Sequence, residues 1–415
     1  MIQSPRNTLA KAPWVLKVAL ITAPLVIVFL SISNAPFFTH AKFGGHIVGR
    51  DFLNYWTGSK LFLSGRLGTL YDAVAYPAYL DSVWGNGFGS LSFSYPPTLL
   101  PFISWLGLFP YGVALVLWSV LGVGLLIAAG WPYTKQPLVL LALIFAPAVC
   151  VCLDDGQNGL IFSAMLVAAL RVLDRKPILA GVLIGLLTVK PQLGILLPIA
   201  LICAGRWKTV GAAAVTTLAL VALSLLIAGA EPWRLYFEKV VPYQSRLFRG
   251  DGMWQTMTPS PVIAIVVAHG SWALAWAVQA AVSAAMMVLV AVLFLGRGNG
   301  RSIGAVDRVI LTGATFLATP YAFNYDMPSL ALCLLMAGVT QPQSDATAQG
   351  RWGQAILWSA PIAMVMTGLW SVNGAFIVAA GLGLYVWAAR TEIFAAGGRP
   401  SWLADMLQRA SRAAT

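Results

Sequence analysis

The chain has 415 residues, of which 59% are hydrophobic and only 10% are charged, and its mean hydropathy is +0.79. Soluble domains carry about a quarter charged residues, so this composition excludes an ordinary soluble protein and predicts an integral membrane protein. The net charge of +12 is typical of a membrane protein oriented by positive cytoplasmic loops, and we expect no nucleic-acid partner.

Apolar runs of helical length recur along the whole chain and predict an all-α polytopic bundle of about twelve transmembrane helices. The first run follows Arg6, Lys11 and Lys17 without a small-residue cleavage site, so we expect it to be retained. Several runs are shorter than the roughly 20 residues of a straight span, and we expect their ends to line a cavity within the protein. The expected spans are 14–33, 111–130, 138–153, 160–173, 178–189, 193–205, 209–229, 271–295, 307–319, 327–340, 353–370 and 374–389.

Two long loops, 34–94 and 230–260, separate these spans. In the first loop Phe52, Tyr55 and Trp56 share one helical face, and residues 76–84 repeat the same apolar pattern. Such stretches predict amphipathic helices that lie on the outer surface of the membrane.

The apolar segment 99–109 is short and follows two prolines, so we expect it to re-enter the membrane rather than cross it. With the N-terminus inside, the cytoplasmic loops then hold 17 of the 26 Lys and Arg and five of the 14 Asp and Glu, whereas the other side holds nine of each. The positive-inside rule therefore favours this topology, with both termini and the tail 391–415 in the cytoplasm.

Five polar motifs at the ends of apolar runs all fall on the external side of this topology. Scattered loop residues would not sort in this way, so we interpret the motifs as one active site assembled from many helix ends. The motifs are Arg50-Asp51, Ser94 to Pro97, Asp154 to Asn158, Lys190-Pro191-Gln192, and Thr319-Pro320-Tyr321 through Asn324-Tyr325-Asp326.

Asp51 opens the first external helix, where an aspartate is often only the N-cap. The aromatic residues that follow it would partly desolvate the carboxylate and raise its basicity, as a hydroxyl-activating base requires. The cap and the base both remain open.

Lys190 lies between two short apolar runs and directly before a proline. It is either a lysine that extends its ammonium to the membrane surface or a cation in a cavity, where a phosphate is its natural partner. Arg50, Arg234 and Arg246 are further external cations that could hold a phosphate.

Residues 154–158 form a short polar turn, and Gly and Asn are ordinary turn residues. Gln157 and Asn158 could instead bind sugar hydroxyls. The adjacent carboxylates of Asp154 and Asp155 could bind a divalent cation, although the sequence offers no evident third ligand. Asp326 is either a helix cap or part of the site. The four cysteines lie in apolar surroundings without His nearby in ligand spacing, so we expect no disulfide framework and no metal site.

The ordered set of motifs resembles glycosyltransferase family 87. The residues that carry the resemblance are Arg50 to Trp56, Leu70-Tyr71-Asp72, Tyr95-Pro96-Pro97, Gly156-Gln157-Asn158, Leu179-Ala180-Gly181 with Gly185-Leu186-Leu187, and Lys190-Pro191-Gln192, within about residues 45–330. The family is similar to GT-C enzymes, which use lipid-phosphate-linked sugars on the outer membrane face, and its well-known members transfer mannose from polyprenyl phosphate. The resemblance implies that Asp51 is the catalytic aspartate.

Together these features predict one integral membrane glycosyltransferase domain over residues 1–415, in a bacterial inner membrane, with its site on the periplasmic or external face. We expect a polyprenyl-phosphate hexose donor, mannose being the sugar that the resemblance suggests, a lipid or glycan acceptor, inversion at the anomeric carbon, and no cofactor. The expected sugar- or acceptor-binding residues are Tyr55, Tyr95, Gln157, Asn158, Gln192, Tyr321, Asn324 and Asp326. A glycolipid flippase or solute transporter and an O-antigen ligase or polymerase are the alternatives; a transporter would place its polar residues at the midplane, often in internal repeats.

Overall fold

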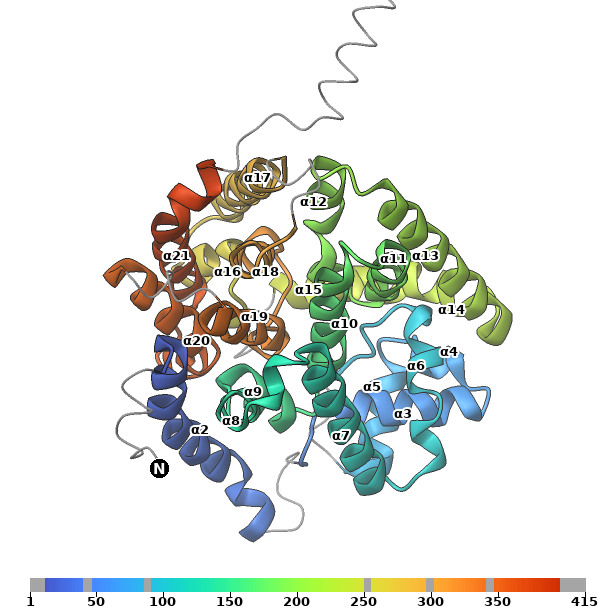
Figure 1. Cartoon of the computed structure of the whole chain (residues 1–415). Helices are drawn as coiled ribbons and strands as arrows, with labels where there is room; N and C mark the ends of the chain where they lie inside the picture. Colours follow the sequence, from blue (N-terminus) through green and yellow to red (C-terminus); the bar gives the residue numbers. More distant parts are fainter. Residues whose placement is uncertain are drawn as a thin grey trace, which may run out of the picture.

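The computed structural model describes residues 12–39, 47–85, 91–249, 255–295, 302–340 and 347–395, and every regular element in these ranges is a helix (Figure 1). Each of the twelve apolar runs of the sequence coincides with a helix or a pair of helices. They are α2 (Trp14–Thr39), α7 (Tyr111–Ala129), α8 (Pro137–Ile144) with α9 (Pro147–Asp154), α10 (Gly159–Val172), α11 (Pro177–Leu186) with η4 (Leu187–Val189), η5 (Pro191–Gly194) with α12 (Leu197–Cys203), α13 (Trp207–Ala228), α17 (Trp272–Leu295), α18 (Ala305–Ala318), α19 (Pro328–Thr340), α20 (Ala348–Gly368) and α21 (Ala375–Ala395).

The expected number of twelve membrane spans is not confirmed. Among the described residues, four helices are long and apolar enough to cross a membrane, namely α2, α7, α13 and α17, and the pair α8 and α9 makes a fifth if its 46° bend lies within one span. Most of the other helices are too short, because prolines interrupt the apolar runs. Pro147, Pro191 and Pro328 each stand at the first position of a helix, where a missing N–H costs nothing.

The short helices form the interior of the bundle. Every side chain of α18 except that of Arg308 is buried, and α19 is buried from Pro328 to Gly338. Helix α10 packs against α7, α11 and α19, and it lies near the centre of the view in Figure 1. A helix enclosed by other helices does not need to match the bilayer thickness by itself, because its ends can be satisfied by protein.

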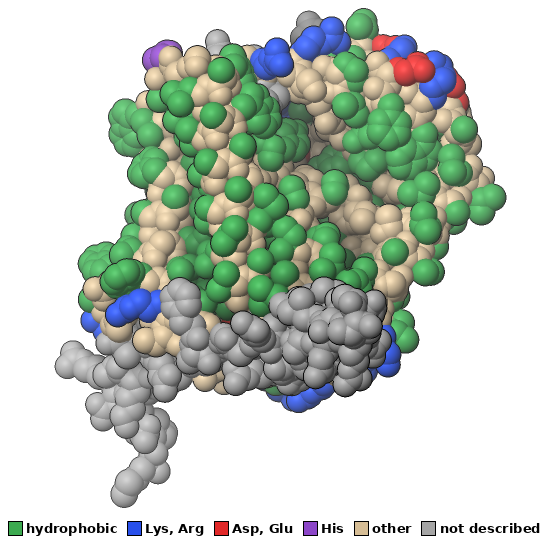
Figure 2. All heavy atoms as spheres, turned by 90° about the horizontal axis from the view of Figure 1, so that it is seen from above, with side chains coloured by type: hydrophobic (Ala, Val, Ile, Leu, Met, Phe, Trp, Pro, Cys, Tyr) green, Lys and Arg blue, Asp and Glu red, His purple; other side chains and the backbone are tan. Residues whose placement is uncertain are grey.

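Hydrophobic side chains form a broad band across the face of the molecule seen in Figure 2, and Lys and Arg side chains lie at its upper and lower edges. The helices that are long enough to span expose large apolar residues, such as Ile21 on α2, Val120 on α7 and Leu226 on α13. A band of this kind buries apolar surface in lipid rather than in a protein core, and it indicates that the protein is embedded in a membrane.

The first long loop contains α3 (Phe52–Leu63), α4 (Leu67–Leu70) and α5 (Ala75–Trp84), and η1 (Pro97–Leu99), α6 (Leu100–Ile103) and η2 (Leu106–Leu108) follow it. The expected helices are therefore present, but α3 does not lie on a surface: eight of its residues are buried, and it packs against α4, α6, α7 and η2. The amphipathic pattern predicted a surface helix because α3 contains polar residues. Two of them, Asn54 and Ser59, are instead hydrogen-bonded inside the protein, to Tyr76 and to the backbone of residues 104 and 107.

Segment 99–109 consists of only short helical turns in the structure, so it forms no continuous spanning helix. The second long loop contains α14 (Glu231–Leu235), the π-helical turn η6 (Tyr236–Val240) and α15 (Val241–Arg249), and α16 (Pro261–Val267) follows it. Trp254, Asp251, Arg297 and the tail from residue 396 lie outside the described residues.

Candidate active site

The five polar motifs meet in one hydrogen-bonded cluster, and the turn Gly156-Gln157-Asn158-Gly159 at the start of α10 lies at its centre. Gln157 is bonded to Asp51 and to the tyrosines at positions 55 and 95, and Asn158 is bonded to Lys190, which in turn is paired with Asp326. The structure thus brings together residues that are up to 275 positions apart in the sequence, between Asp51 and Asp326.

The carboxylate of Asp51 does not cap helix α3. Its side chain makes no cap hydrogen bond, and its Oδ2 accepts a hydrogen bond from Nε2 of Gln157 at 2.5 Å. Oε1 of Gln157 accepts from the hydroxyl of Tyr55 at 2.5 Å, and Tyr55 is 2.7 Å from the hydroxyl of Tyr95. The side chain of Asp51 is therefore held by a side-chain network, and the interpretation of Asp51 as a helix cap is wrong.

The start of α3 is fastened to the turn through the backbone. The N–H groups of Asp51 and Phe52 both donate to the carbonyl oxygen of Asp155, at 3.1 and 3.2 Å. Gly156 has φ +64°, and a Cβ at this position would come within 2.6 Å of Cβ of Phe52. A glycine is thus required both for the backbone conformation and for the close approach of the turn to Asp51.

The second half of the cluster is more deeply buried. Lys190 is 3% exposed and Asp326 is fully buried, and the ammonium of Lys190 pairs with Asp326 and donates to Oδ1 of Asn158 at 2.8 Å. The ammonium also lies 5.2 Å from the ring centre of Tyr325. At Gly159 a Cβ would come within 2.1 Å of the carbonyl oxygen of Tyr325, so a second glycine lets α10 approach the turn η8 (Asn324–Asp326).

The cluster is open at one side and closed at the other. Asp51, Arg50 and Tyr95 are half-buried, whereas Asn158 and Asp326 are inaccessible. Burial raises the pKa of Asp51, and the amide of Gln157, the guanidinium of Arg50 and the ammonium of Lys190 lower it again in part. Burial and the nearby charge of Asp51 raise the pKa of Asp155. A half-buried carboxylate of raised basicity at the open side is suited to take a proton.

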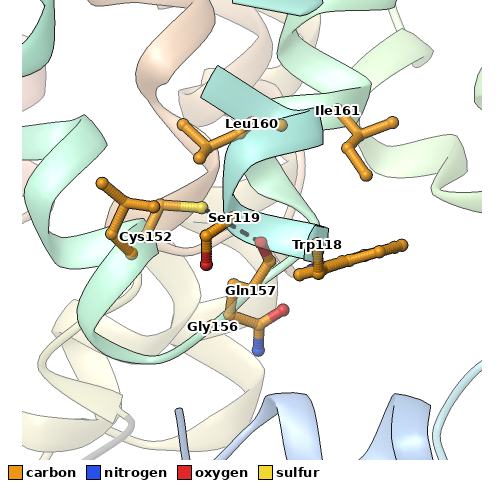
Figure 3. Close-up of a pocket in the computed structure, with 9 residues that line it drawn as sticks. Trp118, Ser119, Cys152, Gly156, Gln157, Leu160 and Ile161 are labelled. Carbon is orange, nitrogen blue, oxygen red and sulfur yellow. Dashed lines mark hydrogen bonds between the residues drawn. The ribbon is translucent and has the colours of Figure 1, made fainter. Parts of the chain in front are cut away.

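A narrow pocket lies behind the turn and is lined by residues of α7, α9 and the start of α10 (Figure 3). The side chain of Gln157 turns away from Leu160 and Ile161 in this view, and Sγ of Cys152 donates to the carbonyl oxygen of Gln157 at 3.4 Å. Trp118 also lines this pocket, and the amide of Gln157 is hydrogen-bonded to Asp51.

Some expected site residues lie near the cluster without a bond to its centre. Asn324 donates from Nδ2 to the carbonyl oxygen of Pro361, so its amide supports the backbone of η8. Tyr321 packs edge-on against Phe323, and Gln192 is half-buried in the turn that follows Lys190.

Two of the three arginines expected to hold a phosphate, Arg234 and Arg246, belong to the second long loop. Arg234 is exposed and paired with Glu231 and Glu238, so its charge is already neutralised, whereas Arg246 is exposed on α15.

Sequence reasoning missed three residues that support the site. The hydroxyl of Tyr111 donates to the carbonyl oxygens of residues 48 and 49 at 2.8 Å, directly before Asp51. Trp118 packs at 5.4 Å from Tyr55, and Gln244 donates to the carbonyl oxygen of Ser94 at 2.7 Å. Tyr111 and Trp118 read as ordinary residues of a transmembrane helix, so no sequence signal could have distinguished them.

The described residues contain no group of three or more His, Cys, Asp or Glu that could hold a metal ion. The four cysteines are free thiols.

The described residues thus form an apolar helical bundle with a polar cluster at its helix ends, which is the architecture of a membrane protein with a buried polar site. The family model of glycosyltransferase family 87 matches residues 93–320, more than half of the chain, and the protein belongs to this family. It is therefore a glycosyltransferase. The matched range contains Tyr95, the turn at 156–159 and Lys190, whereas Asp51 and Asp326 lie outside it. No curated protein and no solved structure matches the chain.

Proposed function

We propose that the protein transfers a hexose from a polyprenyl-phosphate donor to a hydroxyl of a lipid or glycan acceptor at the outer membrane surface, with Asp51 as the general base. The observation that carries this proposal is the placement of Asp51 at the open side of a buried network rather than in a helix cap. The membrane would be a bacterial inner membrane, with both termini in the cytoplasm, and mannose is a candidate for the sugar.

The proposed reaction is a direct displacement. The acceptor oxygen forms a bond to the anomeric carbon, and the bond between that carbon and the phosphate oxygen breaks. The electron pair leaves with the polyprenyl phosphate, and the acceptor proton passes to the carboxylate of Asp51. Phosphate is a good leaving group without protonation, so one base and compensating cations are sufficient, and attack from the opposite face inverts the anomeric centre.

Lys190 and Arg50 are the proposed cations for the donor phosphate. The ammonium of Lys190 has three donors, of which two point to Asn158 and Asp326, so one remains for a phosphate oxygen. Arg50 is half-buried beside Asp51 at the open side of the cluster, and it could meet the phosphate first. Arg246 is exposed in the second long loop, where we assign it to attraction of the donor rather than to the reacting centre. Arg234 has no part in this proposal, because Glu231 and Glu238 neutralise its charge.

The alternatives differ from this proposal in testable ways. A flippase or transporter would move a glycolipid without breaking a bond. Membership of a glycosyltransferase family argues against this alternative. An O-antigen ligase or polymerase would use a diphosphate-linked glycan, and only the donor distinguishes it from the proposed enzyme.

The proposal is tested by incubating the purified protein with a panel of polyprenyl-phosphate sugars and membrane-lipid acceptors. Mass spectrometry should detect free polyprenyl phosphate and a hexosylated acceptor in equal amounts. Matched reactions contain a polyprenyl-diphosphate sugar or a nucleotide sugar. Turnover with either of these, and none with any polyprenyl phosphate, would contradict the proposed donor.

A further inference from the structure

Three side chains that the sequence offers for sugar or acceptor binding have their polar atoms turned toward one another. Tyr55 is fully buried, Gln157 is 6% exposed, and Tyr95 is half-buried. Their hydrogen bonds run in one direction, from the tyrosines to Gln157 and from Gln157 to Asp51. Side chains engaged in this way have little capacity left for a sugar.

The chemistry of the four groups fixes the orientation of the Gln157 amide. A carboxylate only accepts hydrogen bonds, so the NH₂ group of Gln157 must face Asp51. The amide oxygen then faces Tyr55, whose hydroxyl donates its single proton to it. Tyr95 must consequently donate to the oxygen of Tyr55 or to that of Gln157, and both arrangements hold the amide in the same orientation.

The bond from Gln157 also distinguishes the two oxygens of Asp51. Oδ2 accepts from Gln157, while Oδ1 makes no hydrogen bond to the described part of the chain. The backbone of Asp51 is held by its hydrogen bond to Asp155, and the hydrogen bond from Gln157 to Oδ2 sets the rotation of the carboxylate. Oδ1 is therefore the oxygen presented to a substrate.

We propose that Gln157 is a positioning residue, oriented by Tyr55 and Tyr95, which holds the carboxylate of Asp51 so that Oδ1 takes the proton of the acceptor hydroxyl. This inference rests on the proposed function of Asp51 as the base. It assigns Gln157, Tyr55 and Tyr95 to orientation of the base and not to contact with the sugar. An amide is suited to this task because it donates to the carboxylate and stays uncharged at neutral pH.

The first test replaces Gln157 by Met and compares turnover with substrate affinity. Displacement of a catalytic group by about 1 Å can cost on the order of a hundredfold in rate, so we expect kcat to fall 10- to 100-fold while the KM values for donor and acceptor change less than threefold. Gln136→Met, at an exposed position between α7 and α8, is the matched control and should behave as wild type. Equal melting temperatures show that each variant is folded.

The second test is the pH profile of kcat/KM. Gln157 stabilises the ionised form of Asp51, so its removal should raise the pKa of the base, and the acid limb should move to higher pH by about one unit. The other groups that act on Asp51 stay in place in this variant. They are Arg50, Lys190 and Asp155, with Tyr55, Tyr95, Tyr111, Tyr321 and Tyr325 around them. A purely structural role for Gln157 would lower activity without moving this limb.

The third test asks whether Tyr55 acts through Gln157. Tyr55→Phe should lower kcat in the native background and have little further effect in the Gln157→Met background, because the bond that it supports is already gone. Tyr79→Phe, whose ring lies against Arg66 outside the cluster, is the matched control. If the losses in kcat from Tyr55→Phe and Gln157→Met are additive, Tyr55 does not act through Gln157, and this part of the proposal is wrong.

The outcomes separate this inference from the function on which it rests. If Asp51→Asn is inactive but Gln157→Met has normal kcat and an unshifted pH profile, Asp51 remains the base and the positioning role is wrong. A Gln157→Met variant that raises only the KM of one substrate would make Gln157 a binding residue. An active Asp51→Asn variant would remove the proposed function itself.

Discussion

At the scale of single residues, Lys190 has one task that the structure shows and one that is proposed. It neutralises the buried carboxylate of Asp326, and it is proposed to hold the donor phosphate. A buried ion pair contributes little net stability, but removal of one partner leaves an uncompensated charge. A single substitution of Lys190 therefore cannot distinguish a structural loss from a catalytic loss.

A single and a double variant distinguish the structural task of Lys190 from its proposed contact with the phosphate. Lys190→Met alone should lower the free energy of unfolding by about 3–5 kcal/mol, because Asp326 is left buried without its partner. Lys190→Met with Asp326→Asn should recover most of that stability, as measured by thermal unfolding in detergent. Turnover should stay low in the double variant if Lys190 contacts the phosphate. A double variant with normal turnover would restrict Lys190 to a structural role.

At the scale of elements, the turn before α10 places four successive residues, 156–159, in different contacts. Gly156 lets the turn approach Asp51 and Phe52, and Gly159 lets α10 approach Tyr325. The two polar residues between the glycines consequently face opposite halves of the site, Gln157 toward Asp51 and Asn158 toward Lys190.

Gly159→Ala should disrupt the site, because its new Cβ would stand 2.1 Å from the carbonyl oxygen of Tyr325 and the backbone of η8 would have to shift. We expect loss of most activity together with a lower melting temperature. Gly124→Ala on α7 is the matched control, since a Cβ there has no atom within 4 Å. In the control, replacing a helical glycine should be neutral or stabilise the protein by up to about 1 kcal/mol. Equal behaviour of the two variants would contradict the close approach.

The positions of the helices were predictable from the sequence, but the burial of some of them was not. Apolar runs located every long helix, because a membrane bundle must be apolar wherever it is helical. The burial of α3 was not predictable, since Asn54 and Ser59 look solvent-facing until Tyr76 and residues 104–107 are placed beside them. The pairing of Lys190 with Asp326 was not predictable either, because the two residues are 136 positions apart in the sequence.

At the scale of the whole molecule, loops predicted on the same side of the membrane contact one another. On the predicted cytoplasmic side, Arg206 pairs with Asp174 at 2.6 Å, and the N–H of Ile303 donates to the same carboxylate at 3.0 Å. On the predicted external side, Lys239 pairs with Asp72, and Lys190 pairs with Asp326. Contacts of this kind are expected if the loops in each set lie on one side of the membrane.

Reporter fusions test this topology. Fusions at Lys135, Lys176 and Arg206 should read cytoplasmic, because these loops carry the positive excess. A fusion after Tyr243 in the second long loop should read external. An external reading at Lys135 would mean that segment 99–109 crosses the membrane, and the polar motifs could then not share one external face.

The central claim is that Asp51 takes the proton of the acceptor, and the rate of hexose transfer by Asp51→Asn tests it most directly. Asparagine keeps the size of the side chain and can accept a hydrogen bond from Gln157, but it cannot act as a base. A positioned base contributes about a hundredfold to ten-thousandfold, so transfer should fall by at least a hundredfold while donor binding and the melting temperature stay near wild type. A variant that is folded, binds donor and retains more than a tenth of the wild-type rate would contradict the account, and Asp326 would be the next carboxylate to test.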